Sequence, residues 1–248
     1  MLYIQKTEEP YAVRTQRIKI QHSLEWKNLI EGDTTAVRGF FDQLPKDSIR
    51  NALLKEQKGL CAYCMRRLEP DGFHTQIEHW TPLSRDKDLA LSYSNMLGVC
   101  DGGKSYDGRQ KVLSCDASKS NEAEITINPQ DLVQMRQIAY LRDGTIYTIS
   151  RDEKLERDLN EVLKLNGKLD CKGHRIADTA TCLVKNRKDA YEQGRQWIQM
   201  LDRAKKCTSA VIEKKIKEIT DAPQMPEYAG VFLFVLKKKQ RQLEKRGL

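Results

Sequence analysis

The sequence predicts an α+β fold that is mostly helical, with helical N-terminal and C-terminal segments around a small metal-stapled centre. Before Gly59 and after Asp131, apolar residues recur at helical spacing. The stretch 59–130 is rich in Gly, Ser, Asp and Asn, has weak periodicity and holds four of the seven cysteines. Because such a stretch cannot bury a large apolar core, we expect a metal ion to hold it together. The chain is therefore divided into parts 1–58, 59–130 and 131–248.

The first part is predicted to be an arm followed by helices. Trp26, Leu29 and Ile30 lie at helical spacing. Apolar residues also recur about every 3.6 positions over 46–58, which predicts a helix that leads into the first cysteines, with Asp47 as its N-cap.

The last part is predicted to be helical. Amphipathic patterns cover 151–169 and 179–208, and a basic terminal helix is expected over 231–245. Asp143-Gly144 predicts a turn between two short strands.

Composition limits the function. The 248 residues carry a net charge of +8 and the pI is near 9.0, which favours an anionic partner, nucleic acid first. No signal peptide is recognised, and the longest apolar run, 230–236, is too short to span a bilayer. We therefore expect a cytoplasmic protein without membrane contact. Disulfides are rare in that compartment, so clustered cysteines point to metal.

The cysteines supply the strongest motif. Cys61-Ala-Tyr-Cys64 has the spacing of a zinc knuckle, and Cys100 and Cys115 can complete a tetrahedral structural Zn²⁺ site. The other three cysteines are expected to be core thiols, although a second metal site at Cys171 and His174 is a weaker alternative.

Catalytic groups are expected between the cysteine pairs. Glu78 can hold a hard divalent cation, such as Mg²⁺, and His79 can take a proton from the attacking water. Because adjacent strand residues point to opposite faces, both can serve one site only at a bent or irregular strand end. Asn95 is expected to fix the loop or the imidazole tautomer. The alternative is a surface glutamate beside a packed histidine.

A second cation ligand is expected after the second cysteine pair. Two similar runs, Cys100-Asp-Gly-Gly-Lys104 and Cys115-Asp-Ala-Ser-Lys119, each place an acid after a cysteine. Asp116 is favoured over Asp101 because the residues after it lack glycine and can begin a helix. Asn121 is a further alternative.

Residues 98–105 match the phosphate-binding loop pattern G-x-x-x-x-G-K-[ST]. The pattern should follow a buried strand and open a long helix, but Tyr106-Asp107-Gly108-Arg109 is a poor helix start. An ATPase is therefore not expected.

These motifs together resemble the HNH endonuclease family in its ββα-metal form. The resemblance rests on Cys61-x-x-Cys64, Ile77-Glu78-His79, Tyr93-x-Asn95, Cys100 and Cys115-Asp116. More narrowly, the chain resembles the PtuB-like HNH component of Septu-type anti-phage defence, some members of which accompany retrons. That likeness rests on Lys6-x-Glu-Glu-Pro10, Leu60-Cys-Ala-Tyr-Cys64, the wide spacing from Cys100 to Cys115, and Asn160-x-x-Leu163-x-Leu165-Asn166.

The resemblance implies an HNH core in 59–130 in which Glu78 is the first cation ligand, His79 the general base and Asn95 the central amide. Many HNH enzymes place His or Asn where this chain has Asp116. It also implies a PtuA-like ATPase partner and, for the retron-associated members, a reverse transcriptase with its nucleic acid.

The expected function is therefore a metal-dependent nuclease acting on DNA or RNA, including tRNA. Basic residues around the centre are expected to track phosphates, namely Arg66, Arg67, Arg85, Lys104 and Lys119. The alternative is a zinc-stabilised binding or scaffold subunit without catalysis.

Overall fold

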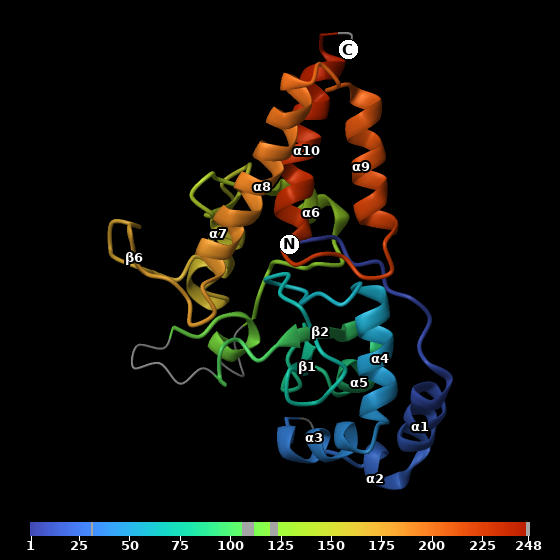
Figure 1. The fold of residues 1–248 in the computed structure, drawn as a ribbon. Helices are drawn as coiled ribbons and strands as arrows, with labels where there is room; N and C mark the ends of the chain where they lie inside the picture. Colours follow the sequence, from blue (N-terminus) through green and yellow to red (C-terminus); the bar gives the residue numbers. More distant parts are fainter. Residues whose placement is uncertain (31, 106–111, 120–123, 247–248) are drawn as a thin grey trace.

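The computed structural model describes residues 1–248 except 31, 106–111, 120–123 and 247–248. The fold is α+β, as predicted, with about half of the chain helical and small two-stranded antiparallel sheets. Figure 1 shows a lower block of N-terminal helices around strands β1 and β2, and a stem of three long C-terminal helices above it.

The N-terminal helices cover one side of the central sheet. They are α1 (Tyr11–His22), α2 (Leu24–Lys27), α3 (Thr34–Asp42) and α4 (Lys46–Glu56). The predicted helix over 46–58 is confirmed as α4, which buries Ile49 and Leu53 one turn apart. The expected N-cap is wrong, because Pro45 occupies that position and Asp47 lies in the first turn, where it pairs with Arg50 at 2.9 Å.

The central segment is a short antiparallel sheet with helical turns around it. Its elements are β1 (Thr75–His79), α5 (Lys87–Leu91), the 3₁₀ turn η1 (Tyr93–Asn95), β2 (Met96–Cys100) and the 3₁₀ turn η2 (Cys115–Ser118). Strand β1 pairs with β2 so that Glu78 faces Leu97 and His79 faces Met96. The sheet has two strands, so the other edge of β1 is unpaired within the described part of the chain.

The C-terminal part begins with small elements and ends with the stem. The small elements are α6 (Leu132–Gln137), β3 (Ile138–Tyr140), β4 (Ile146–Thr148), α7 (Glu153–Arg157), the π-helical turn η3 (Asp158–Val162), β5 (Lys168–Leu169) and β6 (Arg175–Ala177). The stem consists of α8 (Leu183–Arg203), α9 (Ser209–Asp221) and α10 (Ala229–Glu244). None of the helices in the described residues has the length and apolar surface that crossing a bilayer requires.

The predicted turn at Asp143-Gly144 is confirmed, since it joins β3 to β4. The helix expected over 151–169 is shorter, because it ends at Val162 and the chain then forms β5. The helices expected over 179–208 and 231–245 are α8 and α10, with shifted ends. Helices α3 and α9 were not predicted, although α9 has apolar residues at helical spacing.

Two apolar clusters hold these parts together. The larger one joins the cysteine segment to the C-terminal helices and includes Leu60, Val99, Leu159 and Leu236. The smaller one packs the N-terminal helices against the sheet and includes Phe41, Ile49, Leu91 and Met96. The centre is therefore wedged between two helical bodies, and does not rely on the cysteines alone for its burial.

Candidate active site and metal centre

Four buried cysteines meet in the centre of the molecule. The Sγ atoms are 3.9 Å apart for Cys61 and Cys115, 3.6 Å for Cys64 and Cys100, and 3.8 Å for Cys100 and Cys115. A tetrahedral Zn²⁺ site with Zn–S bonds of about 2.3 Å has S–S edges of about 3.8 Å. The thiols therefore have the spacing that a metal ion such as zinc requires, and no disulfide links them.

The local backbone explains how the four thiols converge. Met65 adopts a left-handed conformation with φ 65°, which closes a tight turn in which its N–H donates to the Cys61 carbonyl at 3.0 Å. The N–H of Ala62 donates to the Gly98 carbonyl at 3.0 Å, which fastens this knuckle to β2. Cys100 ends that strand, and its N–H donates to the Cys61 sulfur at 3.4 Å.

The remaining cysteines do not behave as expected. Cys171 and Cys182 are exposed, so the prediction of core thiols is wrong for these two, whereas Cys207 is half-buried and packs against the larger apolar core. Cys171 lies in the hairpin between β5 and β6, Cys182 immediately before α8, and Cys207 in the turn between α8 and α9. All three thus lie outside the observed helices, although the pattern over 179–208 predicted a helix around Cys182 and Cys207. Among the described residues, the four-cysteine cluster is the one group of three or more ligating side chains close enough to share a metal ion.

A cavity of about 200 Å³ opens beside the metal centre, along the unpaired edge of β1. Glu78, His79, Asp116 and Lys119 all line it. Consecutive residues of a strand point to opposite faces, but a cavity at a strand edge can be reached from both. Glu78 and His79 therefore both reach one cavity at the free edge of β1, and a bent strand end is not needed.

On the acidic side of the cavity, Glu78 interacts with several neighbouring polar side chains. Glu78 and Asp116 both line the cavity, close enough for the charge of Asp116 to disfavour ionisation of Glu78. Lys119 forms a buried ion pair with Glu78, and the hydroxyl of Tyr63, which lies between Cys61 and Cys64, donates to Glu78 at 3.4 Å. Burial and then the charge of Asp116 raise the pKa of Glu78 to about 8, although Lys119 opposes them.

His79 occupies the other side. Its ring is buried, packs edge-on against Phe41 with centroids 4.5 Å apart, and places Nε2 2.9 Å from the Ala90 carbonyl oxygen. Burial lowers the pKa of His79 to about 4, assisted by the positive charges of Arg38, Lys46 and Lys119, while the bond to Ala90 opposes the shift. The imidazole is therefore neutral near pH 7.

Asn95 does not line the cavity, but holds its walls. Its side-chain amide donates to the carbonyls of Thr81 at 3.0 Å and Leu89 at 3.1 Å, and its carbonyl oxygen accepts from the Thr81 N–H at 2.8 Å. Of the two expected roles, fixing the loop is the one that these contacts support. No bond between Asn95 and the His79 ring is present in the described structure.

The three alternatives for the second cation ligand differ in their position relative to the cavity. Asp101 turns away from the cavity, where it pairs with Arg66 at 3.5 Å and accepts hydrogen bonds from Gly103 and Ser105. Asp116 is the second residue of η2 and lines the cavity with Glu78. Asn121 lies outside the described residues.

The phosphate-loop match at 98–105 also fails in three dimensions. Gly98 is inside β2, opposite Ile77, whereas the first glycine of such a loop follows its strand. The described residues 101–105 form turns and open no helix.

Some of the basic residues expected to track phosphates have other partners. Lys119 has a side chain only 4% exposed and pairs with Glu78. Arg67 donates to main-chain carbonyls of Gly59 and Met225. Arg85 is exposed and pairs with Glu124 at 3.0 Å. Lys119 and Arg67 are therefore structural contacts, and the expectation that they form an open phosphate track is wrong.

Helix α3 also contributes to the cavity, which was not predicted from the sequence. Thr34 and Arg38, one turn apart on that helix, line the cavity opposite β1. Arg38 is exposed and has no ion pair within the described part of the chain. The signal that could have found it was the amphipathic run Val37 to Phe41, which places Arg38 beside the residues that pack against His79.

The donors at the cavity fit a hard cation by their chemistry. Mg²⁺ is commonly held by one or two carboxylates while waters and substrate phosphates complete its shell. Glu78 and Asp116, which line the same cavity, supply such a pair. The four thiols fit a soft metal ion such as zinc, because tetrahedral sets of thiolates are typical of zinc and iron–sulfur sites.

Comparison with models of known protein families gives no match, and comparison with curated protein sequences gives none either. The geometry of the chain must therefore support any functional conclusion by itself.

Proposed function

We propose that this chain is an HNH-type endonuclease that hydrolyses phosphodiester bonds with a divalent cation, beside a structural zinc site. One observation carries the proposal: a single cavity at the free edge of β1 brings together a neutral imidazole, a pair of carboxyl groups and an arginine that forms no ion pair among the described residues. These are the groups that phosphodiester hydrolysis needs, namely a base, cation ligands and a phosphate contact.

His79 is assigned the general base. A carbonyl oxygen can only accept, so the neutral ring must donate to Ala90 through Nε2–H. Its Nδ1 atom then has a free lone pair that can accept a proton from water. Burial keeps the ring unprotonated, and so able to accept a proton, over the whole physiological pH range.

Glu78 and Asp116 are assigned the cation ligands. When bound, the cation stabilises negative charge on the scissile phosphate and on the leaving oxygen. The chain prepares this position by holding both carboxyl groups against each other, with Tyr63 donating to Glu78 from the zinc knuckle. A metal ion bound by the cysteines would thus help to position the carboxyl group of Glu78 through Tyr63.

Arg38 is assigned the contact to the phosphate. A guanidinium can bind two phosphate oxygens at once and keeps its charge at every working pH. Helix α3 presents Arg38 to the same cavity that Glu78 and Asp116 line, so a phosphate bound there would contact Arg38.

The test compares two histidines that lie five residues apart. His79→Ala should lower cleavage of plasmid DNA or of total tRNA by about 10²- to 10⁴-fold while nucleic-acid binding is retained. His74→Ala is the matched control, because His74 is exposed, pairs with Asp71 at 2.8 Å and does not line the cavity. Equal cleavage by both variants, or no cleavage by the parent protein with Mg²⁺ or Mn²⁺, would contradict the proposal.

The proposal extends to a role in anti-phage defence beside an ATPase partner. It is supported by the likeness of the motifs to PtuB-like proteins and by the lack of phosphate-loop geometry at 98–105. The cleavage assay is therefore run with and without the product of a neighbouring ATPase gene. Use of both plasmid and tRNA separates DNA from RNA as substrate.

One observation favours a second candidate, a zinc-stabilised binding or scaffold subunit. Lys119 already neutralises Glu78, and an acidic pair that has a lysine partner does not require a cation. Lys119→Met separates the two functions. A nuclease should bind Mn²⁺ more tightly once the competing ammonium is removed, whereas a scaffold should bind nucleic acid as before and gain no cation site.

A further inference from the structure

The positive charge of this chain is concentrated in one structural unit. Residues 183–248 contain sixteen of the 43 Lys and Arg residues but eight of the 35 Asp and Glu residues, so this stretch has the whole net charge of +8. Residues 1–182, which contain the cysteine cluster and the cavity, have equal numbers of acidic and basic residues and are neutral. Since 183–248 includes the stem of α8, α9 and α10, the excess charge is spatially separate from the cavity (Figure 1).

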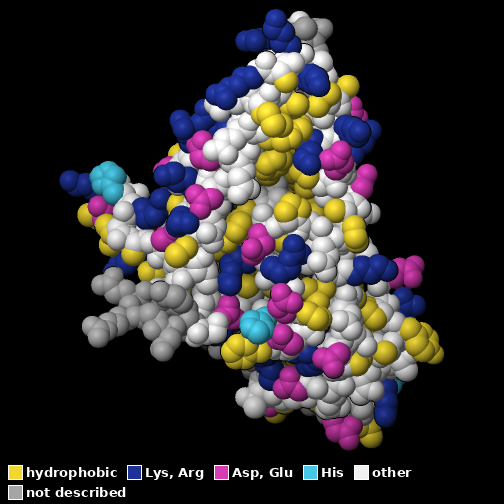
Figure 2. All heavy atoms as spheres, viewed as in Figure 1, with side chains coloured by type: hydrophobic (Ala, Val, Ile, Leu, Met, Phe, Trp, Pro, Cys, Tyr) yellow, Lys and Arg dark blue, Asp and Glu magenta, His cyan; other side chains and the backbone are white. Residues whose placement is uncertain are grey.

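Contacts between the helices define the tip of this stem. Lys239 of α10 pairs with Asp202 at the end of α8 at 2.9 Å. Glu244 near the end of α10 accepts a hydrogen bond from Ser209 at the start of α9 at 3.5 Å. These contacts bring together the end of α8, the turn that follows it and the end of α10, which together form the tip of the stem. Figure 2 shows Lys and Arg side chains along the stem and at its top.

Most cations at this tip are exposed and not neutralised. Eight of them form no ion pair among the described residues: Arg203, Lys205, Lys206, Lys237, Lys238, Arg241, Lys245 and Arg246. Cations near a helix C-terminus stabilise the helix by interacting with its dipole, but this effect is confined to the last turn. Lys237 and Lys238 lie well before the last turn of α10, so helix stability alone does not explain the set.

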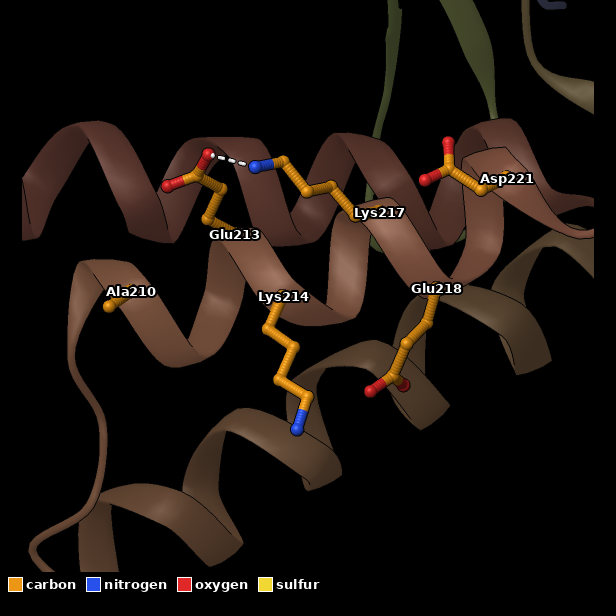
Figure 3. A pocket seen from close by; sticks show the side chains of 6 residues that line it. All are labelled: Ala210, Glu213, Lys214, Lys217, Glu218 and Asp221. Atoms are coloured by element: carbon orange, nitrogen blue, oxygen red, sulfur yellow. Dashed lines mark ion pairs between the residues drawn. The ribbon is translucent and has the colours of Figure 1, made fainter.

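The outer face of α9 provides an internal comparison. A depression there is lined by residues of this single helix, which are Ala210, Glu213, Lys214, Lys217, Glu218 and Asp221 (Figure 3). Lys217 pairs with Glu213 at 2.9 Å, and three carboxylates outnumber two ammonium groups. This face is self-compensated, so the free positive charge belongs to the end of α8, the turn that follows it, and α10 with the residues just after it.

We propose that the tip of the stem is a second nucleic-acid contact, which binds the phosphate backbone away from the cutting cavity. Lys237 and Lys245 are separated by about 12 Å along α10, from a rise of about 1.5 Å per residue. That length corresponds to about three or four phosphates of one DNA strand, which are about 3.4 Å apart along the helix axis. The inference rests on the proposed function in one respect, that the ligand is nucleic acid.

An acidic protein is the other class of partner that a cationic surface could bind. Protein interfaces depend on buried aromatic or aliphatic anchors surrounded by polar residues. Among the large apolar side chains of the described stem, Met200 alone is largely exposed to solvent, at 57%. Figure 2 shows an apolar strip along the stem, and Trp197, Phe232 and Phe234 of α8 and α10 are partly buried against the core. Charge without apolar anchors favours a phosphate backbone.

The test measures binding to a fluorescent duplex, and to a single strand of the same sequence, in EDTA so that cleavage cannot contribute. In the stem variant, Arg203, Lys206, Arg241 and Lys245 are all changed to Gln. The matched control removes the same charge from the body by changing four exposed residues without ion pairs to Gln: Lys19, Lys27, Lys55 and Arg136. Circular dichroism and thermal unfolding verify that both variants fold.

The salt dependence decides the outcome. Over about 50–200 mM salt, the slope of log Kobs against log [salt] should become shallower by about 0.9 for each lost phosphate contact in the stem variant, and stay unchanged in the control. Equal slopes in both variants, or no binding by the parent, would overturn the inference. Unchanged binding by the stem variant with loss of a co-purified acidic protein would also overturn it, in favour of a protein interface. Stem-dependent binding without cleavage would reject the nuclease and leave the stem contact intact.

Discussion

Asn95 and His79 are linked through the backbone of one short helix. The Asn95 side chain donates to the Leu89 carbonyl at 3.1 Å, and the next carbonyl, that of Ala90, lies 2.9 Å from Nε2 of His79. Asn95 therefore holds helix α5 in the position from which Ala90 sets the imidazole tautomer. The amide acts on the base without touching it, which makes Asn95 a positioning residue.

Replacing Asn95 tests this linkage. Asn95→Ala removes three hydrogen bonds of a buried side chain, which should lower the free energy of unfolding by about 2–4 kcal/mol. If Asn95 positions His79, the acid limb of the pH–rate profile should also move to higher pH, because the ring is less well buried and less firmly held.

The control for this prediction is Asn166→Ala. Asn166 is also buried and bonds to both the N–H and the carbonyl of Ile146, far from the cavity residues. It should reduce stability in urea unfolding and leave the pH profile in place. Identical pH profiles for both variants would show that Asn95 has a structural role only.

Arg38 should affect both binding and the state of the base. Arg38→Ala removes a charge-assisted hydrogen bond to phosphate, worth about 1.5–3 kcal/mol, so kcat/KM should fall by about 10- to 100-fold. The charge of Arg38 also helps to lower the pKa of His79, so the acid limb of the rate profile should move upward. Arg38→Lys should restore the pH limb but only part of kcat/KM. Steady-state kinetics that match the parent protein would exclude Arg38 from the site.

The four thiols should bind one zinc ion and stabilise the centre. Cys115→Ser should abolish stoichiometric zinc binding, measured by elemental analysis, and a chelator should then cause no further loss of thermal stability. Structural zinc supplies about 10–16 kcal/mol of apparent binding free energy, which is comparable to the whole stability of a domain. Cys171→Ser is the control, because Cys171 is exposed and outside the cluster. Zinc retained in both variants would refute the site.

The cation requirement should depend on pH in a defined direction. Glu78 has a raised pKa of about 8, so at lower pH it must lose a proton before it binds a cation. The half-saturating Mg²⁺ concentration should therefore rise about tenfold per unit as pH falls from about 8 to about 6.

At saturating Mg²⁺, the same range should show little change in rate. His79, with its pKa lowered to about 4, remains neutral and able to accept a proton throughout. Titration of cleavage with Mg²⁺ at several pH values measures both quantities. A cation requirement that does not change with pH would remove Glu78 from the ligand set.

Local patterns in the sequence predicted the parts of this protein that depend on neighbouring residues. The spacing of Cys61 and Cys64 predicted a knuckle, and apolar periodicity predicted α4, α8 and α10. Helix ends were less accurate, because capping and left-handed residues, such as Lys205 with φ 53°, decide where a helix stops.

Pairings between distant segments could not be predicted in the same way. Lys119 and Glu78 are 41 positions apart, and the sequence placed Lys119 on an open phosphate track when it is buried in an ion pair. Arg38 is 41 positions from His79 and was not recognised at all. Such contacts depend on how α3 and η2 pack around the edge of β1, which no local spacing encodes.

By itself, the sequence determined the chemistry that this chain has available: four thiols, a carboxylate beside an imidazole, and an excess of positive charge at the C-terminal end. Only the tertiary structure decided which groups share a cavity, which lysine is neutralised, and that the excess charge lies on a separate stem. The physical reason is that residue type and short-range spacing are local properties, whereas burial and pairing of charges arise only when distant segments pack together.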